Sequence, residues 1–469
     1  MINDQEYITT ELKKTLEKMI ILSTPRLNNL IAMIIGIITS QSVILSKISQ
    51  ELKDCYSLGT EESKIKRLQR FLSNKAINPE KLYEFFSYKL LQKYKFRSKS
   101  IYIIFDHTTI DDRFVILQFS LKVGKRAIPL WFKLFKYKQD GNKDFIHVKE
   151  GLKFLHKILT PYEFDVTILA DRGFKSIDLF KFIDETLKWK YCIRCTKDMG
   201  ISIAGKSKIK KLDDITPTKW STKYFYNIKL TAQEYICNMA VCKAQDAEDV
   251  WFIANNLSEP YAIREYKKRF DIEEMFRDFK SNGFNLENTW STDIHYDKML
   301  YFCVCIAYSY IVSLGTSCTK DKKNKLLSET KNIKGKKIRI YSLFTTGIKW
   351  FKRSYYLVKK TGCEDCKKKN DCDDNEILAD YSIPLDKFYD KYDGPNDNNY
   401  DYRVEHIFAH HYTDAVGANT CASSVCSKDR EGVATYYLTF KDADEYENKI
   451  KPIFEDVHLS ALAVENKLD

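Results

Sequence analysis

The sequence predicts an α/β protein in which a mixed sheet, interrupted by a β-rich insertion, follows an all-helical N-terminal domain. Three observations predict this fold class. Apolar residues recur at steps of three and four through the first 95 or so residues, which is typical of amphipathic helices. Near Ser100 the pattern changes to continuous apolar runs separated by turn-like residues, as in buried strands. Between about Thr196 and Ala247 short alternating β-type segments occur without a strong helix, so this stretch is expected to be an insertion.

The helical N-terminal region is expected to bury one side and to expose basic residues on the other. The apolar steps are clearest through Leu27, Leu30, Ile34 and Ile38. The segment 63–73 places basic side chains beside a narrow apolar stripe, which suits a helix lying on DNA. These side chains are Lys64, Lys66, Arg67 and Arg70. A solvated surface helix is an equally good interpretation of this segment taken alone.

The middle of the chain carries seven expected elements in the order βββαβαβ. Strands are expected at 101–105, 114–121, 128–135, 166–170 and 189–194, and helices at 145–159 and 176–187. This order is that of a ribonuclease H-like fold. After the insertion, a strand is expected at 250–254 and helices at about 262–282 and 298–314.

These elements divide the chain into six expected segments. They are a helical DNA-binding domain at 1–98, a catalytic core in two parts at 99–195 and 249–315, the β-rich insertion at 196–248, a basic and aromatic segment at 316–356, and an acidic tail of unknown role at 357–469.

Charge is unevenly distributed along the 469 residues. Lys and Arg number 76 against 64 Asp and Glu. Residues 357–469 carry a net charge of −10, so residues 1–356 carry +22. The larger part therefore favours a polyanionic partner such as DNA, although solvated lysines give the same count without any partner.

The sequence gives little indication of a membrane or secretory protein. The start has no basic region followed by an apolar core, and the longest apolar run, Leu30 to Thr39, is too short to span a bilayer and contains Gly36. Thirteen cysteines, an odd number, fit reduced thiols better than a disulfide framework. The expected location is the cytoplasm, in association with DNA and without a membrane.

Two aspartates stand where predicted strands end. Asp106 ends the first strand and Asp171 the fourth, and these strands are neighbours in a ribonuclease H-like sheet. Both carboxylates would then emerge at one edge and could share divalent metal. Two ions about 4 Å apart are suited to phosphodiester chemistry, because they activate the attacking oxygen and stabilise the leaving oxygen. Each aspartate taken alone would more simply be a turn residue.

A third carboxylate is expected from the helix at about 262–282. At 3.6 residues per turn, Tyr266, Arg269, Glu273 and Lys280 lie within an arc of roughly 60°, whereas Glu274 points elsewhere. Helical phase therefore favours Glu273 as the third metal ligand. The cations and the phenol on its face are suited to hold a DNA phosphate, although an ordinary solvated, charge-paired helix face is the simpler alternative.

The same spacing resembles the YREK signature of DDE transposases of the insertion-sequence-four family. The first two acids lie in family-like settings, IIFDHT and ILADRGF, and the resemblance spans about residues 10–356. It implies a transposase that binds terminal inverted repeats, cleaves them and transfers the freed ends into target DNA. It also implies two Mg²⁺ or Mn²⁺ ions on Asp106, Asp171 and Glu273, and a homodimer in the synaptic complex.

The resemblance further implies DNA contacts. Trp251 matches the position of a tryptophan that stacks on a flipped base in such enzymes, although a core aromatic on a strand is the alternative. Arg172, beside Asp171, could touch DNA or orient a carboxylate.

Three other hypotheses remain open. One is a different metal nuclease of the same fold, and another is a catalytically silent, DNA-binding descendant of a transposase. The third concerns Cys363, Cys366 and Cys372, which could bind zinc together with a later histidine, although reduced thiols are the favoured interpretation.

Overall fold

The computed structural model describes most of the chain up to Tyr356. The described residues are 4–52, 59–93, 98–110, 113–136, 144–203, 210–217, 221–230, 234–243, 249–289, 291–320, 327, 330–333, 336–339 and 341–356. The acidic tail, with the cysteines considered for zinc, lies outside them. The chain divides into two compact units. Of the described residues, one unit contains those within 4–40, 45–68 and 310–356, and the other contains those within 41–44 and 69–309.

The first unit is mainly helical. Its elements are α1 (Asp4–Glu17), α2 (Thr24–Ser40), α3 (Leu45–Glu51), most of α4 (Glu61–Leu72), the second part of α10 (Ile294–Lys320), α11 (Leu343–Tyr356) and the hairpin of β11 (Thr330–Ile333) and β12 (Lys336–Arg339). Helix α2 is buried from Leu30 to Thr39, because this part of its sequence is apolar up to Ile38. Helices α10 and α11 lie very close together: a Cβ atom on Gly315 would lie 1.9 Å from the Leu343 carbonyl oxygen, and one on Gly347 would lie 2.0 Å from the Ile311 carbonyl oxygen.

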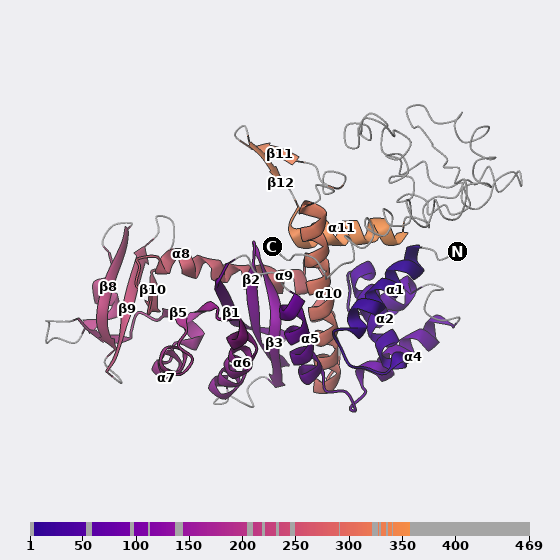
Figure 1. Ribbon diagram of the computed structural model, residues 1–469, viewed down its shortest axis with the longest axis horizontal. Helices are drawn as coiled ribbons and strands as arrows, with labels where there is room; N and C mark the ends of the chain where they lie inside the picture. Colours follow the sequence, from indigo (N-terminus) through magenta and orange to yellow (C-terminus); the bar gives the residue numbers. More distant parts are fainter. Residues whose placement is uncertain are drawn as a thin grey trace, which may run out of the picture. The chain divides into compact units, whose positions relative to one another are not determined.

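The second unit is built on one ten-stranded sheet (Figure 1). Its strands are β1 (Ser100–Ile110), β2 (Phe114–Val123), β3 (Arg126–Lys136), β4 (Asp165–Ala170), β5 (Lys190–Cys195), β6 (Gly200–Ser202), β7 (Lys210–Lys211), β8 (Ser221–Leu230), β9 (Tyr235–Lys243) and β10 (Trp251–Asn255). Its helices are α5 (Pro79–Lys93), α6 (Asp144–Leu159), α7 (Ile177–Lys181), α8 (Ala262–Tyr266), α9 (Phe270–Phe279) and the first part of α10.

The strand order confirms the predicted fold class. The sheet runs β3-β2-β1-β4-β5-β10-β9-β8-β6-β7. Strands β1 to β3 form an antiparallel meander, and β4 and β5 are parallel to β1. This is the ribonuclease H-like arrangement. The strands of the insertion continue the same sheet through β10, which pairs antiparallel with β5.

The two faces of the sheet are covered by different helices. Gln118 on β2 accepts a hydrogen bond from the Tyr301 hydroxyl of α10 at 2.8 Å, whereas the next residue, Phe119, contacts α6. A Cβ atom on Gly151 of α6 would lie 2.6 Å from the Phe119 ring, so only glycine allows this approach. Because successive side chains of a strand point to opposite faces, α10 and α6 lie on opposite faces of the sheet.

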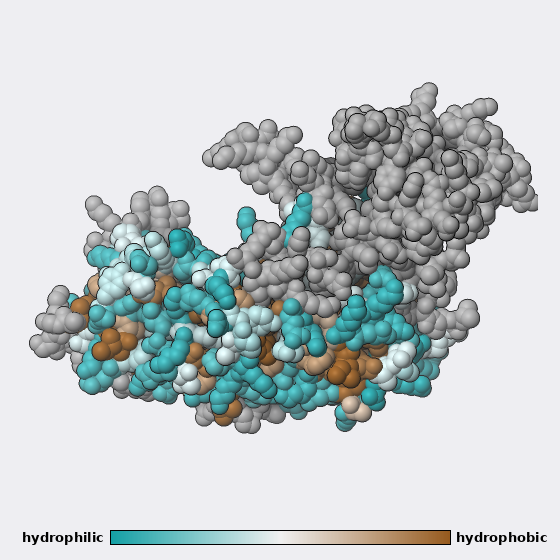
Figure 2. All heavy atoms as spheres, in the orientation of Figure 1, coloured by the Kyte–Doolittle hydropathy of each residue, from teal (hydrophilic) through white to brown (hydrophobic). Residues whose placement is uncertain are grey.

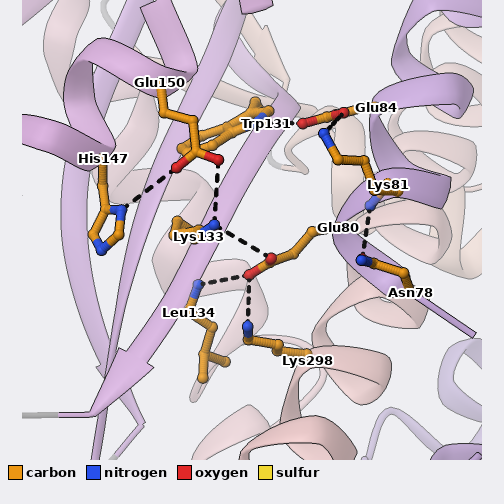
Figure 3. Close-up of polar contacts among 10 residues, drawn as sticks. All are labelled: Asn78, Glu80, Lys81, Glu84, Trp131, Lys133, Leu134, His147, Glu150 and Lys298. Atoms are coloured by element: carbon orange, nitrogen blue, oxygen red, sulfur yellow. Dashed lines mark hydrogen bonds and ion pairs between the residues drawn. The ribbon is translucent and has the colours of Figure 1, made fainter. Parts of the chain in front are cut away.

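The β3 edge of the sheet is covered by α5 through a polar network (Figure 3). Glu80 of α5 accepts a hydrogen bond of 3.5 Å from the backbone N–H of Leu134, and it pairs with Lys298 at 3.0 Å and Lys133 at 3.6 Å. Glu84 accepts a hydrogen bond from the Trp131 indole at 3.2 Å. An edge strand with free N–H groups is a site for unwanted pairing, and this network protects it.

One described helix, α10, is long and apolar enough to cross a membrane by length and composition. Its most apolar window is wholly buried inside the protein, as in the core helix of a soluble fold. On the face drawn in Figure 2, hydrophilic residues cover most of the described surface, and apolar residues form smaller patches between them.

Candidate active site

Three carboxylates come together on one face of the sheet, from β1, from the end of β4 and from α9. Asp106 does not end its strand as expected, because β1 continues to Ile110 in its pairing with β2. Phe105 and Ala170 are partners in the parallel β1–β4 pair, so the next residues, Asp106 and Asp171, stand at the same level and point to the same face. Helix α9, which supplies Glu273, contacts both β1 and β3. The three acids chosen from the sequence are thus neighbours in space.

Arg269 binds two of these carboxylates directly. Its guanidinium donates a hydrogen bond to Asp106 Oδ2 at 2.9 Å and another to Glu273 Oε1. The Arg269 side chain is buried, and its charge offsets part of the repulsion between the two acids. Asp106 Oδ1 also accepts a hydrogen bond from the His107 backbone N–H at 2.8 Å.

Tyr266 holds the remaining carboxylate. Its hydroxyl donates to Asp171 Oδ1 at 3.2 Å, and its ring makes an edge contact with Trp251 at 5.5 Å between centroids. Trp251 also lies 5.7 Å from the ring of Phe270, which is partly exposed. Trp251 therefore lies beside the carboxylates, partly buried, and is neither a fully buried core residue nor a free surface residue.

Burial dominates the electrostatics of this site. It raises the pKa of Asp106 to about 6; Arg269 lowers this pKa, and the carboxylates of Asp171 and Glu273 raise it. Burial likewise raises the pKa of the Tyr266 hydroxyl, so Tyr266 acts as a neutral hydrogen-bond donor. The pKa of Arg269 is raised although burial lowers it, because Tyr266 and the surrounding carboxylates favour its charged form.

The helix expected at about 262–282 is interrupted. Helix α8 ends at Tyr266, a 3-10 turn spans Lys267–Arg269, and α9 ends at Phe279. Tyr266, Arg269 and Glu273 still meet at the carboxylates, with Arg269 and Glu273 paired one helical turn apart, whereas the expected polar face does not extend to Lys280. Lys280 follows α9 with a non-helical backbone, and its ammonium group pairs with Glu287 at 2.8 Å. The structure thus brings Tyr266 and Arg269 to the carboxylates and leaves Lys280 paired elsewhere.

Helix α9 presents its other acids to the β2–β3 hairpin. Asp271 pairs with Lys122 at 3.1 Å, while Glu274 and Asp278 each lie 3.6 Å from Arg126. These ion pairs fix the rotation of α9 and leave Glu273, not Glu274, beside Arg269. The ranking of the two glutamates by helical phase agrees with this geometry.

Two charged residues near Asp171 were not singled out from the sequence. Arg194 on β5 and Asp249 just before β10 form an ion pair of 3.2 Å, and Arg172, which was singled out, lies 3.7 Å from the same Asp249 oxygen. The available signal for Arg194 was a lone cation within the apolar strand sequence YCIRC. Asp249 carried no such signal.

Within the described part of the chain, no group of three or more His, Cys, Asp or Glu side chains is arranged to hold a metal ion. The Arg269 guanidinium lies between Asp106 and Glu273, to each of which it donates a hydrogen bond. The seven described cysteines are free thiols, including Cys192 and Cys195 on β5.

Residues 137–310 match the family model of the transposase DDE domain. The match includes Asp171, Arg269 and Glu273, while Asp106 precedes it. No curated protein matches the chain. Among solved structures, the chain is similar to the Argonaute of Marinitoga piezophila, crystallised with a 5′-OH guide RNA and target DNA. That similarity has 15% identity and a TM-score of 0.20, and it covers 46% of this chain and 32% of the Argonaute chain. The family match supports a DDE transposase.

Proposed function

We propose that this protein is a DNA transposase of the insertion-sequence-four type with the YREK signature. It binds the terminal inverted repeats of its element, cleaves the strands and transfers the ends into target DNA. The observation that carries the proposal is the convergence of Asp106, Asp171 and Glu273 around Arg269 and Tyr266. Expected partners are double-stranded transposon ends, target DNA and a second copy of the chain in the synaptic complex. The expected location is the cytoplasm, on DNA.

The donor set fits two Mg²⁺ or Mn²⁺ ions. Hard divalent cations prefer carboxylate oxygens, and burial together with the neighbouring acids raises the pKa of Asp106, which is the electrostatic signature of a site that gains from a cation. Asp106, Asp171 and Glu273 would hold the ions. When bound, the ions would activate the attacking oxygen and stabilise the leaving oxygen.

The chain's own residues then position the DNA. Tyr266 keeps its proton and can donate a hydrogen bond to a phosphate oxygen in place of Asp171. Arg269 can turn its fork of N–H donors from the carboxylates to a phosphate, since guanidinium geometry suits both groups. Trp251, beside Tyr266, offers a ring on which an unpaired base can stack. Arg172 and Lys280 supply further cations for the DNA backbone.

The first experiment compares two adjacent glutamates. Glu273→Ala should reduce metal-dependent cleavage of DNA carrying the element's ends by at least about a hundredfold, because it removes a proposed metal ligand. Glu274→Ala is the matched control, since Glu274 pairs with Arg126 and Arg277. Cleavage by purified protein on end-containing duplexes is the measurement. If the Glu273 variant cleaves as fast as the control, the assignment of the third ligand is wrong.

A catalytically silent, DNA-binding descendant is the alternative function. The two proposals separate on the unmodified chain, because a silent descendant binds end-containing DNA but gives no nicked product with Mg²⁺ or Mn²⁺. Retention of all three carboxylates favours the active enzyme.

A further inference from the structure

Asp249 occupies a site that is built for an anion. One oxygen of its carboxylate, Oδ2, lies 3.2 Å from the Arg194 guanidinium and 3.7 Å from that of Arg172. The Asp249 side chain is 65% exposed, whereas that of Arg194 is 13% exposed. The cation is therefore held by the fold, while the anion that it binds lies at the surface.

This pair stands beside the candidate active site. Ala170 and Ile193 are partners in the parallel β4–β5 pair, so the following residues, Asp171 and Arg194, lie at one level and point to one face. Arg194 thus flanks Asp171 on the β5 side of the sheet, opposite the side on which Asp106 and Arg269 lie.

Arg194 retains unused hydrogen-bonding capacity. Its Nε atom is buried and has no hydrogen-bond partner among the residues that the structure describes. A carboxylate that approaches one terminal nitrogen leaves this donor unsatisfied, whereas a phosphate, with more acceptor oxygens and more charge, can engage two donors of the fork. An unsatisfied buried donor costs free energy, so exchanging the carboxylate for a phosphate would recover part of it.

We propose that Asp249 is an internal substitute for a DNA phosphate: its carboxylate binds Arg172 and Arg194 in the free protein, and the backbone phosphate of a bound DNA strand displaces it. This inference rests on the proposed function, and it adds how the candidate active site binds the backbone of its DNA substrate. Arg194 is then a positioning residue that binds the backbone next to Asp171. Asp249 is a competitor whose removal strengthens DNA binding.

The proposal predicts that substitutions of Asp249 and of Arg194 change the affinity for DNA in opposite directions. Binding of a short fluorescein-labelled DNA duplex is measured by fluorescence anisotropy in EDTA, over a series of NaCl concentrations. Asp249→Asn should tighten binding about three- to tenfold, because it removes a competing anion and one repulsive charge. Arg194→Gln should weaken binding about fivefold or more and lower the slope of log affinity against log salt by about one.

Arg277→Gln is the matched control, because Arg277 is a surface arginine paired with Glu274 on α9. It should change neither quantity beyond the small effect of one surface charge. Thermal unfolding of each variant verifies folding, and Asp249→Ala provides a second test of the same sign if Asp249→Asn is unstable. Weaker or unchanged DNA binding by the folded Asp249 variant would overturn the proposal, as would an Arg194 variant with unchanged affinity.

The proposed function and this inference fail in different ways. If the unmodified protein binds no DNA, the proposed function itself is contradicted. If it binds DNA but the Asp249 and Arg194 variants do not shift in opposite directions, only the displacement by phosphate is contradicted.

Discussion

Two arginine–carboxylate groups flank Asp171, and they differ chiefly in burial. Arg269, with a side chain only 6% exposed, binds Asp106 and Glu273. The other group joins Arg194 and Arg172 to Asp249, whose side chain is 65% exposed. Separating the buried charges of Arg269 and Asp106 leaves each with little water, whereas exposed charges, including that of Glu273, are readily solvated. The first group therefore stabilises the metal-free site, and the second exchanges its anion at a lower cost in free energy.

The largest expected effect comes from removing the buried cation. Arg269→Gln should lower the free energy of unfolding of the metal-free protein by about 3 kcal/mol, because it leaves the Asp106 carboxylate without its buried cation. Urea denaturation in EDTA, with Arg277→Gln as the exposed control, is the measurement. A loss as small as that of the control would show that Arg269 is not what stabilises the carboxylates.

The second effect is a pH dependence of stability from Asp106. Its pKa in the folded protein is about 6, above the ordinary value of 3.8, so the folded state favours the protonated acid. The protonated Asp106 carboxyl therefore stabilises the folded state at pH values below about 4, and this stabilisation is lost as the pH rises through 6. The Asp106→Asn variant cannot lose this stabilisation, because an amide does not titrate. The free energy of unfolding of the variant, relative to that of the unmodified protein, should therefore rise by about 2 kcal/mol between pH 4 and pH 8.

This comparison is made by urea denaturation in EDTA at each pH, and it does not depend on the absolute stability of the variant. A stability difference that is flat from pH 4 to pH 8 would mean that Asp106 titrates in the folded protein as it does in the unfolded chain.

The smallest expected effect is that of Arg172, at the exposed end of the comparison. Its side chain is 54% exposed and it shares Asp249 with Arg194. Arg172→Gln should change the free energy of unfolding by no more than about 0.5 kcal/mol, because exposed ion pairs contribute little. If Arg172→Gln lowers the free energy of unfolding as much as Arg269→Gln does, the two arginine–carboxylate groups do not differ in their contribution to stability.

The sheet and the three carboxylates were accessible from the sequence because local patterns determine them. Continuous apolar runs identify buried strands, and Asp106 and Asp171 follow two of these runs directly. Parallel pairing of β1 with β4 then brings them to one level. Glu273 was distinguishable from Glu274 because α9 is regular from Phe270 to Phe279.

What the sequence did not reveal depends on contacts between distant segments. Arg269 reaches Asp106 on β1 across 163 residues of chain, and the periodicity of the helix contains no sign of this contact. The Arg194–Asp249 pair likewise joins residues that are separated in the chain by the whole insertion. Pairings of this kind follow from strand order, which periodicity alone does not supply.

The insertion begins after Cys195 and ends beside the same residue, since Cys195 and Phe252 are direct partners in the β5–β10 pair. The two ends of the inserted chain are therefore fixed next to each other by the parent sheet, whatever lies between them. Closing a longer loop between fixed ends costs little more than closing a shorter one, because the entropy grows only logarithmically with length. Related chains can thus gain or lose whole hairpins at this point during evolution while the strands that carry the carboxylates keep their register.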